Sequence, residues 1–270
     1  MDLQLKDKVA LISGGASGIG KGIVDCLLQE GCKVAFVDRS ESGVAQQSVA
    51  EAGGFPLLFI QGDLTKEQTC SDAVERTVAT FGRLDILVNN AGFNDGVNLN
   101  AGPAAFQSSL QKNLFHVYSL THFAAPHLKS VAGCILNIGS KVAITGQGGT
   151  SGYAAAKGAV NALTREWAVE LAPAGVRVNT VLPAETWTPL YEKCLAALPD
   201  PDAAKFEIEQ FIPLNRRLTT IEEIAHTAVF LASPRSSHTT GQMIVVDGGY
   251  THLDRKCTST GSATDFGGAL

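Results

Sequence analysis

The sequence predicts an α/β protein built as one domain around a parallel β-sheet, and three observations lead to this fold class. Short apolar runs of strand length alternate along the chain with longer segments of helical periodicity, the pattern of repeated strand–helix–strand units. The runs are continuously apolar, as expected for strands buried on both faces of a sheet. The chain has 270 residues, 45% of them hydrophobic and 17% charged, which suits one large domain.

Seven apolar runs are predicted as strands, at 9–12, 33–37, 57–60, 86–88, 134–138, 176–181 and 243–246. The predicted helices are a segment from a glycine-rich turn to about residue 30, then 41–52, 66–81, 103–130 with a break near Asn113, 152–172, 189–211 and 220–232. Because parallel neighbours need right-handed helical crossovers, the strands should form one doubly wound, seven-stranded parallel sheet with helices on both faces. Residues 1–254 are predicted as this domain, and the small, polar segment 255–270 as an irregular C-terminal tail.

Composition and charge exclude several classes of partner. The 21 Lys and Arg residues against 26 Asp and Glu give a formal charge of -5, and the absence of long basic clusters argues against nucleic acid and membrane partners. The sequence contains neither a targeting peptide nor a long apolar span, so a soluble, cytoplasmic protein is predicted. The six scattered cysteines are expected to be reduced, and the six histidines lack metal-ligand spacing, so no metal site is predicted.

A glycine-rich turn links the first predicted strand to the first helix, and it consists of Ser13, Gly14, Gly15, Ala16, Ser17, Gly18, Ile19 and Gly20. Backbone N–H groups and the positive helix end can hold a pyrophosphate there, and glycines let the phosphate approach closely. The segment from Gly15 to Lys21 also fits P-loop spacing, but the next residue is Gly22, where Mg²⁺ coordination requires Ser or Thr. The turn is therefore predicted to bind a dinucleotide, as in a single-domain Rossmann fold.

The residue that ends the second strand bears on the choice of nucleotide. Asp38 lies 18 residues after Gly20, close to the offset at which an acidic side chain accepts hydrogen bonds from the adenosine ribose. Its carboxylate would repel a 2′-phosphate and so favours NAD, whereas Arg39 could pair with that phosphate, which leaves NADP open. Asp63 and Leu64 are predicted to flank the adenine, although Asp63 could equally be the N-cap of the helix 66–81.

Tyr153 and Lys157 lie four residues apart in a helical segment, so both project from one face of that helix. A phenol is a poor base at neutral pH, and a nearby ammonium group is expected to lower its pKa by favouring the phenolate. Ser140 should lie at the sheet edge where ligands bind, so its hydroxyl could orient a substrate oxygen toward Tyr153. Asn113, in the break of the long helix, is predicted to hold a water that relays a proton from Lys157.

With these motifs the chain resembles the short-chain dehydrogenase/reductase family over about residues 5–250. The pattern is carried by the glycine-rich turn, Asn89-Asn90-Ala91-Gly92, Asn113, Ser140, Tyr153, Lys157 and Val246-Asp247-Gly248-Gly249. The resemblance implies that Tyr153 is the proton donor and acceptor and that Lys157 also binds the nicotinamide ribose. It further implies a set of cofactor-binding residues, namely Ser13, Gly14, Ser17, Gly18, Ile19, Gly20, Asn90, Ala91, Gly92, Pro183 and Thr188.

Two positions depart from the family pattern, and neither removes a reacting group. Ala184 follows Pro183 where the family usually has Gly, and Gly139 stands before Ser140 where it usually has Ser. Thr188 matches the position that bonds the nicotinamide carboxamide, although a Thr before Pro could merely start a helix. The resemblance also implies that the helices 103–130 and 152–172 pack in pairs to form a homotetramer.

Polar residues in the loops after the strands bear on the small-molecule substrate. They are Asn94, Asp95, Lys141, Gln147 and Glu185, with Trp187 and Tyr191 adding aromatic faces. Many donors and acceptors beside an aromatic plane suit a polyhydroxylated ring, whereas a steroid or acyl chain needs a mostly apolar pocket.

These loops are similar to those of the bacterial L-fucose dehydrogenase subgroup and, more distantly, of the type 14 17-beta-hydroxysteroid dehydrogenases. The first resemblance implies oxidation of the anomeric hydroxyl of an aldose to the lactone, with hydride transfer to NAD(P). The alternative is a hydroxysteroid or other secondary-alcohol dehydrogenase or carbonyl reductase of the same family. A nucleotide-sensing regulator on this fold should lack Tyr153 or Lys157, and both are present.

Overall fold

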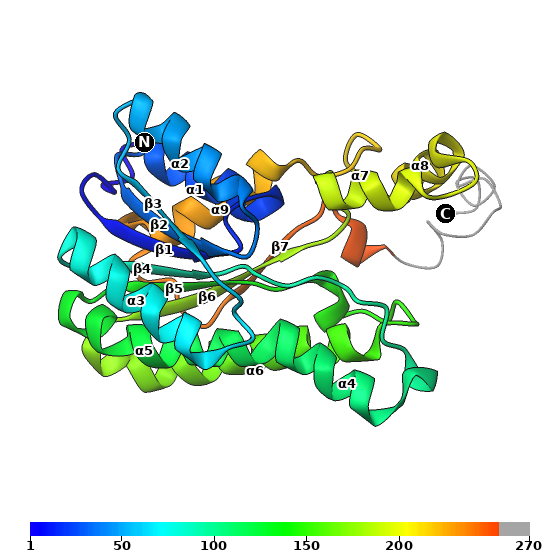
Figure 1. Ribbon diagram of the computed structural model, residues 1–270. Coiled ribbons are helices and arrows are strands. Elements are labelled where there is room, and N and C mark those ends of the chain that lie inside the picture. The colour runs from blue at the N-terminus through cyan, green and yellow to red at the C-terminus, as the bar shows by residue number, and fades with distance from the viewer. Residues whose placement is uncertain (254–270) are drawn as a thin grey trace, which may run out of the picture.

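A seven-stranded parallel sheet forms the centre of the molecule in the computed structural model, which describes residues 1–253 (Figure 1). Its strands are β1 (Val9–Ser13), β2 (Lys33–Asp38), β3 (Leu57–Gln61), β4 (Ile86–Asn89), β5 (Cys134–Ile138), β6 (Arg177–Pro183) and β7 (Met243–Val246). They lie in the order β3-β2-β1-β4-β5-β6-β7, and every neighbouring pair is parallel. The predicted α/β class and doubly wound sheet are therefore confirmed.

Helices cover both faces of this sheet (Figure 1). One face carries α1 (Gly18–Gln29), α2 (Ser42–Ala52) and α9 (Ile221–Ala232), and the other carries α3 (Glu67–Phe81), α5 (His116–Val131) and α6 (Ser151–Leu171). Successive strand residues point to opposite faces, so Ile12 belongs to the core beneath α1 and α9 whereas Leu11 belongs to the core beneath α3, α5 and α6. This burial on both sides explains the continuously apolar strand sequences.

The predicted helix 103–130 is divided where the sequence predicted a break. It forms α4 (Gly102–Leu110), a π-helical turn (Gln111–Phe115) and then α5. Asn113 lies inside the π-helical turn, and its Nδ2 donates to the Ser109 carbonyl at 3.1 Å. Such turns are rare and occur often at functional sites.

The predicted single helix 189–211 is wrong, because the structure has two helices there. They are α7 (Pro189–Ala196) and α8 (Pro201–Gln210). The Asp200 carboxylate begins α8 by accepting a hydrogen bond from the Ala203 N–H at 3.0 Å. The first residue of α8 is a proline, which suits a helix start but cannot continue a preceding helix through a backbone N–H.

The strand order reverses at β1, whose neighbours β2 and β4 lead into opposite halves of the sheet. Ligands of doubly wound sheets bind outside the carboxyl ends of the strands at such a reversal. The segments that leave these ends include the glycine-rich turn after β1, the loop after β4 and the residues after β5 and β6. In Figure 1, α4, α7 and α8 lie toward this end of the molecule.

Three further observations concern membrane-spanning helices, metal sites and the C-terminal tail. Within residues 1–253, no helix has both the length and the apolar character that crossing a membrane requires. The same residues contain no group of three or more His, Cys, Asp or Glu side chains arranged to hold a metal ion. The predicted tail 255–270 lies outside the described residues.

Candidate active site

The glycine-rich turn after β1 is packed too tightly for side chains at Gly14, Gly15 and Gly20. A Cβ atom on Gly14, whose φ is +72°, would lie 3.0 Å from the Ala91 Cα atom. A Cβ atom on Gly20 would lie only 2.0 Å from the carbonyl oxygen of Gly14, so any side chain there would displace the backbone. The turn therefore needs glycine for its own shape as well as for any ligand.

Ser13 and Asn90 fasten this turn to the end of β4. The Ser13 hydroxyl accepts hydrogen bonds from the N–H groups of Asn90 (2.9 Å) and Ala91 (3.1 Å) and donates one to the Val88 carbonyl (3.4 Å). The Asn90 side chain donates to the carbonyls of Ser13 and Gly14, both at 3.0 Å. Both predicted cofactor residues thus hold the turn in place, and the Ser13 hydroxyl is fully occupied within the protein.

The start of α1 fits a pyrophosphate. Ser17 is its N-cap but makes no side-chain capping bond, which leaves N–H groups of the first turn open to an anion. No acidic residue lies in that turn. Ile19 packs partly buried against the core. A Cβ atom on Gly18 would lie 3.8 Å from the side chain of Thr188, so the start of α7 faces the turn.

Thr188 is also the N-cap of α7, because its Oγ1 accepts a hydrogen bond from the Tyr191 N–H at 3.1 Å. The helix-starting role considered for this residue is therefore present. Pro183 is the last residue of β6 and pairs in register with Val246 of β7.

Asp38 lies at the end of β2 and faces the glycine-rich turn. One carboxylate oxygen accepts from the Ala16 N–H at 3.1 Å, and the other accepts from the Ser40 N–H at 3.0 Å. Arg39 is exposed, and its guanidinium carbon lies 5.9 Å from the centre of the Phe93 ring. The carboxylate is therefore fixed beside the turn, whereas the guanidinium group extends over the loop after β4.

Asp63 does not cap α3, contrary to one of the two predicted roles, because the N-cap is Lys66. The Asp63 carboxylate instead binds the Thr65 N–H (3.0 Å) and hydroxyl (2.8 Å) in a local turn. These hydrogen bonds to Thr65 lower the pKa of Asp63. Leu64 is partly buried against the core beneath α3.

Asn113, Lys157 and Gly92 meet beneath the loop after β4. Asn113 is fully buried, and its Oδ1 accepts from the Phe93 N–H at 2.8 Å. Lys157, on α6, is also buried, and its ammonium donates to the Ile138 carbonyl at the end of β5 (2.7 Å). A Cβ atom on Gly92 would lie 3.1 Å from Asn113 Oδ1 and 3.5 Å from Lys157 Nζ, so only glycine brings the loop this close.

Tyr153 and Ser140 complete this group of side chains. The Lys157 ammonium lies 5.6 Å from the centre of the Tyr153 ring, as expected for residues one helical turn apart. Ser140 follows β5, and its hydroxyl hydrogen-bonds to the Tyr153 phenol. The structure therefore brings together all four residues predicted for catalysis, at the carboxyl ends of β4 and β5.

The pKa values in this group differ from the simplest expectation. Burial raises the pKa of Tyr153, and the hydrogen bond from Ser140 only partly offsets it. Burial also lowers the pKa of Lys157 to about 8, because the ammonium form is poorly solvated. The predicted lowering of the Tyr153 pKa by Lys157 is absent in the protein alone, since desolvation dominates both groups.

The loop residues predicted for substrate binding fall into three groups. Glu185 and Tyr191 lie together, because the Tyr191 hydroxyl donates to the Glu185 carboxylate at 2.8 Å, and that carboxylate also pairs with Lys141. Asn94 and Gln147 lie on exposed loops. The remaining two face helices: Asp95 accepts from Ser109 of α4 at 2.8 Å, and the Trp187 ring lies 4.7 Å from the ammonium of Lys205 in α8.

Two residues of this region were missed by sequence reasoning. His116 is buried at the start of α5, and its Nε2 lies 3.0 Å from the Ala91 carbonyl. Burial and the nearby Lys157 charge lower the pKa of His116 to about 4, so its ring is neutral at pH 7. Tyr250, whose ring centre lies 4.1 Å from the Lys141 ammonium, directly follows the Asp247-Gly248-Gly249 motif, and that motif could have drawn attention to it.

Comparisons with known proteins bear on the family that the sequence motifs indicate. Residues 14–251 match the family described as enoyl-(acyl carrier protein) reductase. The L-fucose dehydrogenase of Mus musculus is 39% identical over 255 residues, which cover 94% of this chain and 92% of that protein. The 3-oxoacyl-[acyl-carrier-protein] reductase of Thermotoga maritima is 37% identical over 251 residues, covering 92% of this chain and 99% of that protein.

Solved structures agree with this relationship. The crystal structure of Cj0485 dehydrogenase matches with a TM-score of 0.91 and 44% identity, covering 94% of this chain and 98% of that one. The aldohexose dehydrogenase of Thermoplasma acidophilum matches with a TM-score of 0.84 and 28% identity, covering 93% and 96%. The chain therefore belongs to the short-chain dehydrogenase/reductase family of oxidoreductases, whose cofactor is NAD or NADP.

Proposed function

We propose that this protein oxidises the anomeric hydroxyl of an aldose, L-fucose or a related sugar, to the lactone. The observation that carries the proposal is the charged and polar group directly beside Ser140, in which Glu185 binds both Lys141 and Tyr191. Such fixed donors and acceptors suit a polyhydroxylated ring. Support also comes from relatives named L-fucose dehydrogenase, among them those of mouse and of Bos taurus, which is 38% identical.

The side chains at the carboxyl edge have complementary parts in the proposed reaction. A bound nicotinamide supplies the acceptor for the hydride that leaves C1 of the sugar. Tyr153 accepts the proton of the anomeric hydroxyl, and Ser140 hydrogen-bonds the same oxygen, so that the loss of hydride and proton converts the alcohol into the lactone. Lys157 lies beside Tyr153 on the same face of α6, and in the proposed reaction Asn113 holds a water that relays a proton from Lys157.

We further propose that NAD is the preferred cofactor. The Asp38 carboxylate is anchored by two backbone N–H groups at the end of β2, where it would accept hydrogen bonds from the adenosine ribose and repel a 2′-phosphate. Arg39 is the group that could reverse this preference, but its contact with the Phe93 ring directs it over the loop after β4. The residues that would hold the pyrophosphate are those of the glycine-rich turn and the first turn of α1.

A second candidate is a dehydrogenase or carbonyl reductase acting on a steroid or another apolar alcohol. Exposed apolar side chains on and beside α7 and α8 favour it, and these are Trp187, Leu190, Leu198, Phe206, Phe211 and Leu214. An apolar substrate could cover part of this surface.

Assembly as a homotetramer through the outer faces of α5 and α6 also remains part of the proposal. Tyr118 and Val169 on these helices are 56% and 76% exposed, and a second copy of the chain would bury them.

The test is a spectrophotometric assay of nicotinamide reduction by the purified protein. NAD and NADP are compared with L-fucose, D-arabinose, L-galactose, D-glucose and estradiol. Turnover of L-fucose or a related sugar, faster with NAD than with NADP, is the expected result. Turnover of estradiol without that of any sugar would replace the proposed function by the second candidate, and faster reaction with NADP would overturn the assignment of Asp38.

A further inference from the structure

Four residues from separate elements meet beside Ser140, and we call them the Lys141 cluster: Lys141, Glu185, Tyr191 and Tyr250. The Lys141 ammonium pairs with one carboxylate oxygen of Glu185 and lies 4.1 Å from the centre of the Tyr250 ring. The other oxygen of Glu185 accepts from the Tyr191 hydroxyl at 2.8 Å. The cluster thus combines one positive charge, one negative charge and two aromatic rings.

The position of the cluster follows from the sheet. Lys141 comes directly after Ser140, and Glu185 comes two residues after the end of β6. Because β5 and β6 are neighbours in register, with the Gly139 N–H donating to the Val181 carbonyl at 2.8 Å, the two chains leave the sheet side by side. The charged pair is therefore built next to the hydroxyl that bonds to Tyr153.

The charged pair is largely removed from water but retains hydrogen-bonding capacity. Lys141 is only 8% exposed, yet its ammonium has three donors and one of them is directed to Glu185. A carboxylate has about four acceptor positions, and Lys141 and Tyr191 use two of those on Glu185. A donor and an acceptor are thus left close together, a pattern complementary to two neighbouring hydroxyl groups.

A purely structural role explains this arrangement poorly. A largely buried ion pair stabilises a fold little, because desolvation of both charges offsets their attraction, and apolar side chains would join the same elements at least as well. Charged groups held rigidly beside a reactive residue are instead typical of ligand recognition.

We propose that Lys141 and Glu185 determine substrate specificity by binding the C2 and C3 hydroxyls of the sugar, with Lys141 donating and Glu185 accepting. Tyr191 and Tyr250 are positioning residues that fix the charged pair. This inference rests on the proposed function. It adds the two side chains, Lys141 and Glu185, by which the enzyme would distinguish a polyol from an apolar alcohol. The C2 and C3 hydroxyls are chosen because they lie nearest to C1, which Ser140 and Tyr153 address.

The experiment compares L-fucose with 2-deoxy-L-fucose and 3-deoxy-L-fucose on the wild type and on Lys141→Met, Glu185→Gln and the double variant. The double variant leaves no unpaired buried charge, and thermal melting checks that each protein is folded. We expect kcat/KM of the wild type to fall about 10- to 100-fold on the deoxysugars, as for lost hydrogen bonds to charged groups. In the double variant L-fucose should lose both contacts, mainly through KM, whereas each deoxysugar keeps one of the two hydroxyls and should lose only one contact, so that the preference for L-fucose over the deoxysugars largely disappears.

Lys8→Met is the matched control, because it breaks an ion pair with Asp85 at the opposite edge of the sheet. It should leave the ratio of L-fucose to deoxysugar activity unchanged. Wild-type activity on L-fucose with the same ratio in the double variant would overturn this inference alone. A wild type inactive on every sugar would overturn the proposed function and this inference with it.

Discussion

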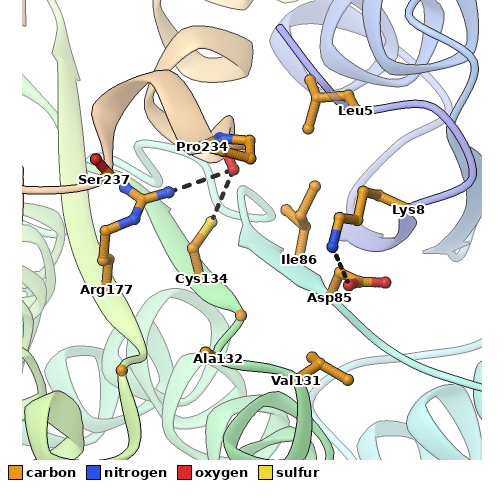
Figure 2. A pocket seen from close by; sticks show the side chains of 13 residues that line it. Leu5, Lys8, Asp85, Ile86, Val131, Ala132, Cys134, Arg177, Pro234 and Ser237 are labelled. Carbon is orange, nitrogen blue, oxygen red and sulfur yellow. Dashed lines mark hydrogen bonds and ion pairs between the residues drawn. The ribbon is translucent and has the colours of Figure 1, made fainter.

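The two ends of the strands, the amino ends and the carboxyl ends, use buried polar groups in opposite ways. We call these the amino edge and the carboxyl edge of the sheet. At the amino ends of the strands, Asp85 accepts hydrogen bonds from the Val9 N–H (3.0 Å), from Lys8 (3.1 Å) and from two nitrogens of Arg83 (2.5 and 2.7 Å). Arg177, at the start of β6, donates to the Leu231 carbonyl at 2.9 Å and to further acceptors around α9. Figure 2 shows the pocket at this edge, where Lys8 meets Asp85 and Arg177 meets the chain after α9. The charged side chains Asp85 and Arg177 at this edge therefore have hydrogen-bond partners, and we call such polar groups matched.

At the carboxyl ends the polar groups are left partly unmatched. Among the described residues, six buried side-chain atoms have no hydrogen-bond partner: Gln46 Oε1, Asn89 Oδ1, Asp95 Oδ2, His116 Nδ1, Asn161 Oδ1 and Thr251 Oγ1. Contacts place them at this edge or just beyond it; for example, Gln46 bonds to Gly15 and His116 to Ala91. Unmatched groups destabilise a fold, so this edge is shaped for ligands, whereas the matched edge stabilises the sheet.

The largest effect that would test this contrast is expected from Tyr153→Phe. The variant removes the phenolic oxygen and should lower kcat about 10²- to 10⁴-fold, the usual contribution of a positioned acid or base. Binding of NAD, measured by fluorescence titration, should persist, because the glycine-rich turn is untouched. Tyr118→Phe is the matched control, since that phenol is exposed on α5. Appreciable turnover by Tyr153→Phe would show that another group moves the proton.

Asp85→Asn tests the opposite edge. Burial alone would raise the pKa of Asp85, but its bonds with Arg83, Val9 and Lys8 hold that pKa below its usual value. The ionised carboxylate therefore stabilises the fold at neutral pH, and this contribution is lost as the pH falls below about 4. We expect the variant to lower the free energy of unfolding by about 2–3 kcal/mol at pH 7, measured by urea denaturation, with kcat unchanged. A loss of activity at unchanged stability would contradict the division between the edges.

The elements and the reactive side chains were predictable because their signals are local. Strands such as β5 are uninterrupted apolar runs, and Tyr153 and Lys157 are one helical turn apart. The prediction of one helix over 189–211 was wrong, because apolar spacing continues through α7 and α8 while the N-cap Asp200 separates them. A capping residue inside a periodic segment was the signal that could have shown the break.

Contacts between residues far apart in the chain could not be predicted from the sequence. Lys141 and Glu185 are 44 residues apart, and Asp85 and Val9 are 76 apart, so only the strand register brings each pair together. The raised pKa of Tyr153 has the same origin: the spacing to Lys157 indicates a nearby charge, but the desolvation that raises the pKa comes from burial in the folded protein. Burial is a property of the packed fold and has no local pattern.

The smallest change in stability expected in this comparison has the most informative sign. Lys157→Met should abolish turnover and yet increase the free energy of unfolding by about 1–3 kcal/mol at pH 7, because burial disfavours the lysine charge. The pKa of Lys157 is lowered from 10.5 to about 8, so between these values the unfolded chain binds more protons and the wild type gains stability as the pH rises. The advantage of the variant, measured by urea denaturation from pH 7 to 10, should therefore shrink with increasing pH. A variant that is less stable at every pH would mean that the bond from Lys157 to the Ile138 carbonyl outweighs desolvation, and that this part of the carboxyl edge stabilises the fold as the amino edge does.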